Sequence, residues 1–153
     1  MSIDRRRFVS ALPALAAGPY LGAVLAGCSS EPLTGPVRIN WDRDVCVRCS
    51  MVISDRHFAA QIRDPMKKVL KFDDFGCAVF WKEHQTWSDA EIEFWAADSS
   101  GAAGDTKWLD ARKAGYVSGK RTPMLYGFAA VNENAAGAVS YADARKQILA
   151  KGK

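Results

Sequence analysis

The first 27 residues limit most strongly what this chain can fold into, because their pattern is typical of an export signal and not of a folded element. Three consecutive arginines, Arg5 to Arg7, precede an Ala- and Leu-rich apolar stretch at 11–26. The consecutive arginines favour the twin-arginine export route. Prolines and glycines interrupt the apolar stretch, which is shorter than the roughly 20 residues that a membrane-spanning helix needs. We therefore expect residues 1–27 to be cleaved and to take no part in the fold.

The signal ends in Leu25-Ala26-Gly27-Cys28, which resembles the cleavage sequence of lipoproteins. This ending predicts that Cys28 becomes the acylated N-terminus of the mature chain and anchors it to a membrane on the periplasmic side. The alternative, a soluble precursor with an odd thiol, is disfavoured because free cysteines are a liability in an oxidising compartment. Residues 28–36 contain Ser, Pro and Gly, and we expect them to form a tether.

The remaining chain, 37–153, is long enough for one domain and too short for two. The whole sequence has a formal charge of +4, and the mature chain has +2, because the signal contains three Arg and one Asp. Positive and negative residues are interspersed. The charge therefore gives no argument for nucleic-acid binding.

Hydrophobic periodicity and turn residues predict a mixed α+β domain. Helices are expected at about 73–84 and 141–151, each preceded by polar capping residues, and a shorter helix is expected at 109–115. Strands are expected at 51–53, 58–63, 69–72, 91–97, 126–132 and 138–140. Turn residues at 64–67 and 132–134 predict two hairpins.

An internal repeat sharpens this expectation. Phe58-Ala59-Ala60 recurs as Phe128-Ala129-Ala130, and after each triplet come a turn, a strand and the Asp-containing start of a helix. We therefore expect two pseudo-repeated ββαβ-like halves packed as one domain. Met51 and Met124 lie shortly before the two triplets. Adjoining halves would bring Met124 toward Met51 and Cys49.

The chemistry is expected in Cys46-Val47-Arg48-Cys49-Ser50-Met51, which holds two thiols and a thioether within six residues. Soft sulfur donors favour Cu(I), Zn(II) or iron–sulfur clusters, and a thioether adds little to a zinc site while it suits Cu(I). The C-x-x-C spacing alone also serves redox disulfides, half of a zinc knuckle, or a small structural disulfide loop. The motif by itself leaves these interpretations open.

Together with motifs further along the chain, these residues resemble the NosL family of periplasmic lipoproteins, which are copper chaperones for nitrous oxide reductase. The motifs cover nearly the whole mature chain: Cys46-x-x-Cys49-x-Met51, Phe58-Ala59-Ala60-Gln61-Ile62, Phe72-Asp73-Asp74-x-Gly76-Cys77, Trp108-Leu109-Asp110-Ala111, Tyr116-Val117, Thr122-Pro123-Met124 and Gly127-Phe128-Ala129-Ala130. The family usually has Gly where this chain has Ser50, and serine is less favourable than glycine at a tight backbone position. The resemblance implies a Cu(I)-binding protein without enzymatic turnover, with nitrous oxide reductase as its copper acceptor and a paired ββαβ-like architecture.

The expected Cu(I) site consists of a thiolate of the Cys46 and Cys49 pair, with Cys49 preferred, together with Met124, and with Met51 as an additional or alternative thioether. Cys46 is then either a second ligand or the disulfide partner of Cys49. His57 is a further candidate, because it lies within reach of Met51 along a hairpin.

Other candidate ligands have structural interpretations. Cys77 is expected to pack as a small buried hydrophobe, His84 to cap the end of its helix, and Asp73 with Asp74 to open the same helix. Two alternatives to the copper chaperone remain. One is a thiol-disulfide oxidoreductase that uses Cys46 and Cys49, and the other is a structural zinc site of Cys46, Cys49, Cys77 and His84.

Overall fold

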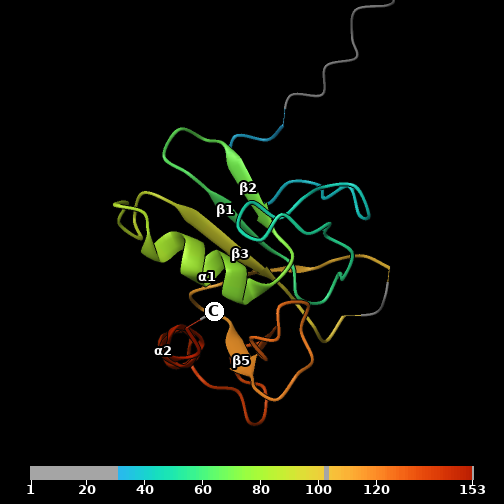
Figure 1. The fold of residues 1–153 in the computed structure, drawn as a ribbon, viewed down its shortest axis with the longest axis vertical. Helices are drawn as coiled ribbons and strands as arrows, with labels where there is room; N and C mark the ends of the chain where they lie inside the picture. The colour runs from blue at the N-terminus through green and yellow to red at the C-terminus, as the bar shows by residue number, and fades with distance from the viewer. Residues whose placement is uncertain (1–30, 102–103, 153) are drawn as a thin grey trace, which may run out of the picture. The chain divides into compact units, whose positions relative to one another are not determined.

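Residues 60–110 build a four-stranded antiparallel sheet in the computed structural model, which describes residues 31–101 and 104–152 (Figure 1). The strands, in the spatial order β2-β1-β3-β4, are β1 (Ala60–Arg63), β2 (Val69–Phe72), β3 (Glu93–Ala97) and β4 (Trp108–Asp110). The expected turn at 64–67 joins β1 to β2, and there the Asp64 carboxylate accepts the backbone N–H of Lys68 at 2.9 Å. All four residues of β1 are buried, because this strand has a neighbour on each side.

Helix α1 (Phe75–Glu83) begins directly after β2 and packs on β1 and β2. Asp74 is its N-cap, and the Asp74 carboxylate accepts the backbone N–H of Gly76 at 2.8 Å. The buried residues of the helix include Phe75, Cys77 and Val79. The first turn of α1 therefore lies in the interior of the protein, at the end of a strand.

Three further elements complete the fold: β5 (Gly115–Val117), β6 (Ala129–Val131) and α2 (Tyr141–Ala150). β5 and β6 pair as antiparallel strands, and a parallel bridge from Asp98 to Ala130 joins β6 to the chain just after β3. α2 begins at the expected cap, where Ser140 Oγ accepts the Asp143 N–H at 3.2 Å. This helix packs against α1 and β5.

Aromatic rings fill the space between these elements. Phe75 of α1 stacks on Phe94 of β3 and on Tyr116 of β5, with ring centroids 5.8 and 4.3 Å apart. Tyr141 of α2 meets Phe75 edge-on at 6.2 Å. The buried Tyr116 hydroxyl donates to the Ala111 carbonyl at 2.5 Å, so its polar atom is satisfied. These rings bring residues from both sheets and both helices into contact.

The mixed α+β class is confirmed, but the two ββαβ-like halves are not. In the first half, β1 and β2 pair directly with each other. In the second half, β5 lies between β6 and Val139, which bridges to Tyr116. Both Phe-Ala-Ala triplets lead into a strand, yet these strands have different partners. The similarity is therefore one of local sequence and element order, not of strand pairing.

Three expected elements and one expected hairpin are wrong. Residues 138–140 form only a single bridge, from Val139 to Tyr116, and the turn at 132–134 closes no hairpin because β6 pairs with β5. Residues 109–115 do not form a helix, because Trp108–Asp110 pairs with β3 as β4 and the chain then turns before β5. This long-range pairing outweighs the local helix propensity. Residues 51–53 form no strand but a single bridge, from Val45 to Val52, because a tight loop occupies the residues between.

The signal segment 1–27 and the expected lipidation site Cys28 lie outside the described residues. Within the described part of the chain, neither α1 nor α2 is long and apolar enough to cross a membrane. The described residues from Pro32 onward form one compact unit.

Candidate metal centre

The candidate site lies where the loop that carries the C-x-x-C motif meets the connection from β2 to α1. β2 ends at Phe72, and the two acids that follow it, Asp73 and Asp74, are buried. The cap of α1 uses Asp74 alone, so the Asp73 carboxylate takes no part in opening the helix. Asp73 and Cys77 are four residues apart in the sequence, and their functional atoms lie within 4.8 Å of each other.

Backbone hydrogen bonds fix the loop of the two motif cysteines. The Cys46 N–H donates to the Met51 carbonyl at 2.8 Å, and the Ser50 N–H donates to the Cys46 carbonyl at 3.0 Å. The Val47 N–H donates to the Lys71 carbonyl at 3.0 Å, which docks the loop on β2. Ser50 has a φ of +62°, a conformation that favours glycine. Serine therefore adopts an unfavourable backbone conformation at this position.

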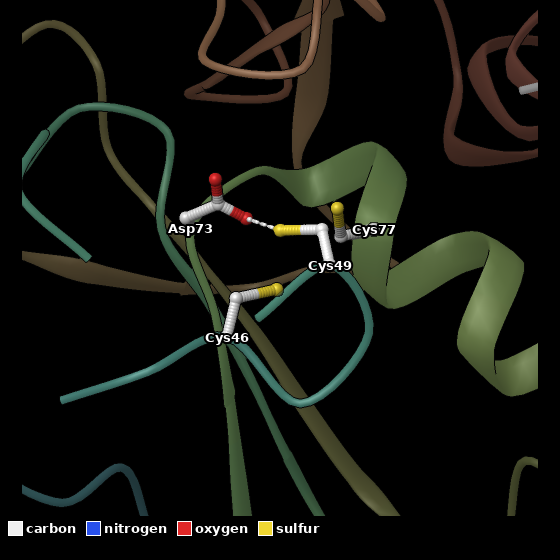
Figure 2. Close-up of side chains that lie close together, drawn as sticks. All are labelled: Cys46, Cys49, Asp73 and Cys77. Atoms are coloured by element: carbon white, nitrogen blue, oxygen red, sulfur yellow. Dashed lines mark hydrogen bonds between the residues drawn. The ribbon is translucent and has the colours of Figure 1, made fainter. Parts of the chain in front are cut away.

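Three thiols and one carboxylate converge at this point (Figure 2). The Sγ atoms of Cys46, Cys49 and Cys77 and a carboxylate oxygen of Asp73 all lie within 4.8 Å of one another. The Cys49 thiol donates to Asp73 Oδ1 at 3.2 Å, and none of the three cysteines is in a disulfide. Cys46 and Cys77 are buried, whereas Cys49 is half-buried. Cys49 is therefore the most accessible sulfur of this cysteine–aspartate cluster.

Contacts within the cluster separate the pKa values of the three thiols. A hydrogen bond from Cys77 lowers the pKa of Cys46 to about 7, against the effect of burial. Burial raises the pKa of Cys49 to about 12, and the contacts with Cys46 and Asp73 act in the same direction. The pKa of Cys77 is also raised, first by its hydrogen bond to Cys46 and then by burial. The raised pKa values keep Cys49 and Cys77 protonated near neutral pH, so a metal that binds all three sulfurs must displace protons.

The second carboxylate oxygen of Asp73 supports a cation site. Asp73 is 2% exposed, and its Oδ2 is buried without a hydrogen-bond partner among the described residues. A buried carboxylate with an unsatisfied oxygen is costly, and a coordinated cation compensates its charge. Three sulfurs and one carboxylate fit a soft or borderline metal ion such as Cu(I) or Zn(II).

Arg48, between the two motif cysteines, borders the cluster beside Cys77. Its Nη1 lies 4.0 Å from Cys77 Sγ and donates to the Tyr126 hydroxyl at 2.7 Å. The guanidinium lies over the Phe80 ring, with Cζ 4.7 Å from the centroid. Tyr126 packs so closely on α1 that a Cβ on residue 76 would lie 2.2 Å from its ring. Gly76 therefore permits the contact that supports Arg48.

Asp74 holds the loop that contains Met124. Thr122 Oγ1 donates to Asp74 Oδ2 at 2.6 Å, and the Met124 backbone N–H donates to the same oxygen at 3.0 Å. Burial raises the pKa of Asp74, while these hydrogen bonds act against the shift. The loop from the second half of the chain is thus attached to the residue next to Asp73.

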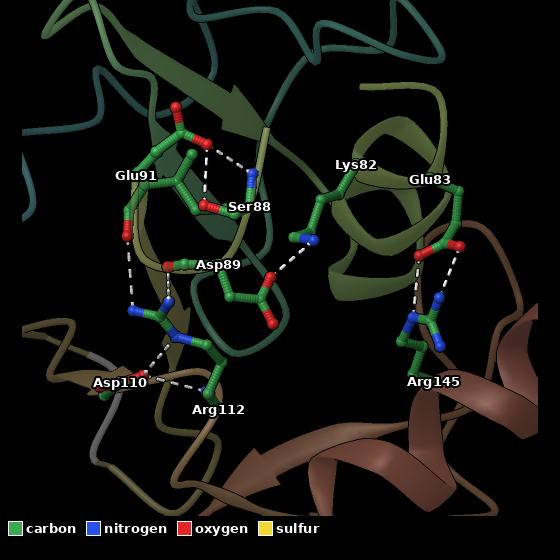
Figure 3. Close-up of polar contacts among 9 residues, drawn as sticks. Lys82, Glu83, Ser88, Asp89, Glu91, Asp110, Arg112 and Arg145 are labelled. Atoms are coloured by element: carbon green, nitrogen blue, oxygen red, sulfur yellow. Dashed lines mark hydrogen bonds and ion pairs between the residues drawn. The ribbon is translucent and has the colours of Figure 1, made fainter. Parts of the chain in front are cut away.

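The opposite end of α1 carries ion pairs (Figure 3). Arg145 of α2 donates to both carboxylate oxygens of Glu83, at 2.8 and 2.6 Å, and Lys82 pairs with Asp89 at 2.6 Å. These pairs tie α2 and the segment after α1 to the last turn of the helix. Their exposed groups make each contribution to stability modest.

The structure brings together two of the four expected ligands, Cys46 and Cys49, and adds Cys77 and Asp73. Met51 is 47% exposed on the motif loop. Met124 is half-buried, with its backbone bonded to Asp74. The role of both thioethers as ligands stays a prediction.

The cluster contains neither histidine. His57 Nδ1 pairs with Asp55 at 3.0 Å. His84 is the C-cap of α1, as expected, and its Nδ1 contacts the Phe80 carbonyl at 2.8 Å. The alternative zinc site of Cys46, Cys49, Cys77 and His84 is therefore wrong in one residue. Asp73, and not His84, lies with the three cysteines.

Sequence reasoning missed Asp73 as a site residue and included Cys77 only in the alternative zinc site. Cys77 is buried as expected, but its sulfur faces the other thiols, and Asp73 does not cap α1. A signal exists in the sequence, since two adjacent acids precede a helix that needs one cap, and a cysteine follows the first acid after four residues. No local sequence pattern predicts that the motif loop docks at this point.

Comparison with known protein families and with curated proteins finds no match for this chain. The fold and the site define a small α+β protein with a cysteine–aspartate cluster that could hold a metal ion.

Proposed function

We propose that this protein binds one Cu(I) ion in the cysteine–aspartate cluster and passes it to a copper enzyme, as a metallochaperone without enzymatic turnover. One observation carries the proposal: three thiols outside any disulfide and one buried carboxylate lie within 4.8 Å of one another. A disulfide between two of the cysteines would leave the third sulfur and the carboxylate buried without a partner for the negative charge. A bound cation would instead be coordinated by the sulfurs and the carboxylate together.

The softness of the donors favours copper. Cu(I) prefers thiolates and thioethers, and the cluster supplies up to three sulfurs. Met51 follows Cys49 on the same loop, and the backbone of Met124 is held beside the cluster by Asp74. Among the metal ions considered, Cu(I) benefits most from such thioethers. The resemblance of the motifs to the NosL family supports the same metal.

The surface of the motif loop favours transfer to a partner. Four exposed large hydrophobic residues of the described chain gather on this loop, with 45 to 50% of each exposed: Val45, Val47, Met51 and Val52. A concentration of exposed apolar side chains marks an interaction surface. Because the half-buried Cys49 lies on the same loop, a docked protein can take the metal by ligand exchange.

The resemblance to the NosL family also supports the acceptor and the location. We infer that the acceptor is nitrous oxide reductase, and that lipid on Cys28 holds the protein at the periplasmic face of a membrane. The tether at 28–36 would then confine the metal site near the membrane and raise its effective concentration for donors located there.

A tetrahedral Zn(II) site is the second candidate, and Asp73 is the observation that favours it. Three thiolates and a carboxylate complete the four ligands of a closed zinc site. A thiol-disulfide oxidoreductase has less support, because Cys46 and Cys49 lie on a loop. They are not at the start of a helix, where the dipole stabilises a reactive thiolate.

Chelator competition with the mature, reduced protein tests the proposal, with Cu(I) and Zn(II) titrated separately. We expect one equivalent of Cu(I) to bind, and Cys46→Ser and Cys49→Ser each to weaken binding at least about tenfold, since each removes a thiolate. Cys28→Ser is the matched control and should bind like the parent.

Met124→Leu and Met51→Leu measure the thioether contributions in the same titration, with the larger loss expected for Met124. Tight Zn(II) binding with weak Cu(I) binding would favour the second candidate. Unchanged binding of both metals in the Cys46 and Cys49 variants would contradict the cluster as the site.

A further inference from the structure

A permanent positive charge lies against the cysteine–aspartate cluster. Arg48 Nη1 is 4.0 Å from Cys77 Sγ and donates to the Tyr126 hydroxyl at 2.7 Å. The guanidinium Cζ lies 4.7 Å from the Phe80 ring centroid and 5.8 Å from that of Tyr126. An arginine keeps its proton throughout the physiological pH range. The charge beside the cluster is therefore constant.

We propose that Arg48 sets the selectivity of the cluster for a monovalent over a divalent metal ion. The inference rests on the proposed function, because it concerns the choice of metal at the same site. With the same ligands, a Cu(I) complex has one more negative charge than a Zn(II) complex. The guanidinium therefore attracts the Cu(I) complex more strongly, by the equivalent of one unit charge.

Burial makes this attraction effective. Cys46, Cys77 and Asp73 are 1%, 0% and 2% exposed, so water screens the cluster poorly from Arg48. The carboxylates of Asp73 and Asp74 are present with either metal and do not change the comparison. One unit charge at a few ångströms in such a site changes an equilibrium constant by at least about tenfold.

The surroundings of Arg48 hold its guanidinium in position. Tyr126 can pack on the first turn of α1 because residue 76 is glycine, and its ring lies 5.4 Å from that of Phe80. Arg48 also lies between Cys46 and Cys49 in the sequence. The loop that supplies two thiolates thus supplies their counter-charge as well.

The test is the ratio of the Cu(I) and Zn(II) dissociation constants, measured by chelator competition for the parent, Arg48→Gln and Arg48→Lys. We expect Arg48→Gln to weaken Cu(I) binding about tenfold more than Zn(II) binding. Arg48→Lys should keep part of the selectivity, because it keeps the charge. Arg56→Gln is the matched control and should leave the ratio unchanged, since Arg56 also stacks on an aromatic ring, at 4.9 Å over Trp41, but donates to the Gly104 carbonyl.

An equal loss for both metals in Arg48→Gln, or an unchanged ratio, would overturn the inference and leave the proposed function intact. A parent protein that binds no Cu(I) would instead contradict the proposed function. If Arg48→Gln does not fold, Tyr126→Phe provides the test, because it removes the hydroxyl that holds Nη1 and keeps the ring. The ratio should then shift less but in the same direction, and no shift would overturn the inference.

Discussion

Replacement of Gly76 by alanine should destabilise the protein, although alanine is the better helix former. A Cβ at this position would lie 2.2 Å from two ring carbons of Tyr126, far inside van der Waals contact. Tyr126 is fully buried and contacts Phe80 and Arg48, so it cannot move away without losing both contacts. Helix propensity favours alanine by about 1 kcal/mol, whereas overpacking a buried ring costs about 1–3 kcal/mol. Since the overlap is severe, we expect a net loss of about 1–2 kcal/mol.

Urea unfolding of the reduced, metal-free protein measures this loss. Gly104→Ala is the control, because a Cβ there meets no atom within 4 Å, and its free energy of unfolding should change by less than about 0.5 kcal/mol. Gly76→Ala should also weaken Cu(I) binding, since a displaced Tyr126 no longer holds Arg48. A Gly76→Ala protein as stable as the parent, or more so, would refute the close packing of Tyr126 on α1.

Three further predictions concern the thiols, the motif loop and the anchor. Thiolate absorbance of the reduced, metal-free protein should show one cysteine titrating at about pH 7, and Cys77→Ala should raise this midpoint, because it removes the hydrogen bond to Cys46. This pKa lies below that of an unfolded thiol, about 8.5, so Cys46 stabilises the fold above that pH and loses this contribution as the pH falls through about 7. Ser50→Gly should raise the free energy of unfolding in urea by about 0.5–1 kcal/mol, because Ser50 has a φ of +62°, and a lower value would argue against strain there. Cys28→Ser should release the mature protein from membranes on cell fractionation, and retention in the membrane fraction would exclude lipid on Cys28 as the anchor.

Local sequence patterns predict those parts of the fold whose signals lie within a few residues. The turn at 64–67, the strand at 69–72 and the two long helices belong to this group, because turn residues, periodicity and caps act locally. The helix expected at 109–115 fails for the opposite reason. Trp108–Asp110 pairs with β3, which is distant in the sequence, and no local sequence pattern predicts this pairing.

The residues of the candidate site also fall into two groups, those that a local sequence pattern predicts and those that depend on the whole fold. Cys46 and Cys49 could be predicted because their spacing is itself a motif. Asp73 could not be assigned to the same point, and Cys77 is expected there only in the zinc alternative, since their approach depends on the bond from the Val47 N–H to the Lys71 carbonyl and on the register of β2. Asp73 Oδ2 has no hydrogen-bond partner in the described part of the chain because the residue is buried, and burial depends on the whole fold.

X-ray absorption at the copper edge tests the central claim most directly, on the mature protein loaded with one equivalent of Cu(I). We predict a first coordination shell dominated by two or three sulfur atoms, because the three thiols of the cluster can reach one ion. A first shell of nitrogen and oxygen atoms, or a protein that retains no copper after removal of excess Cu(I), would contradict a copper site in the cysteine–aspartate cluster.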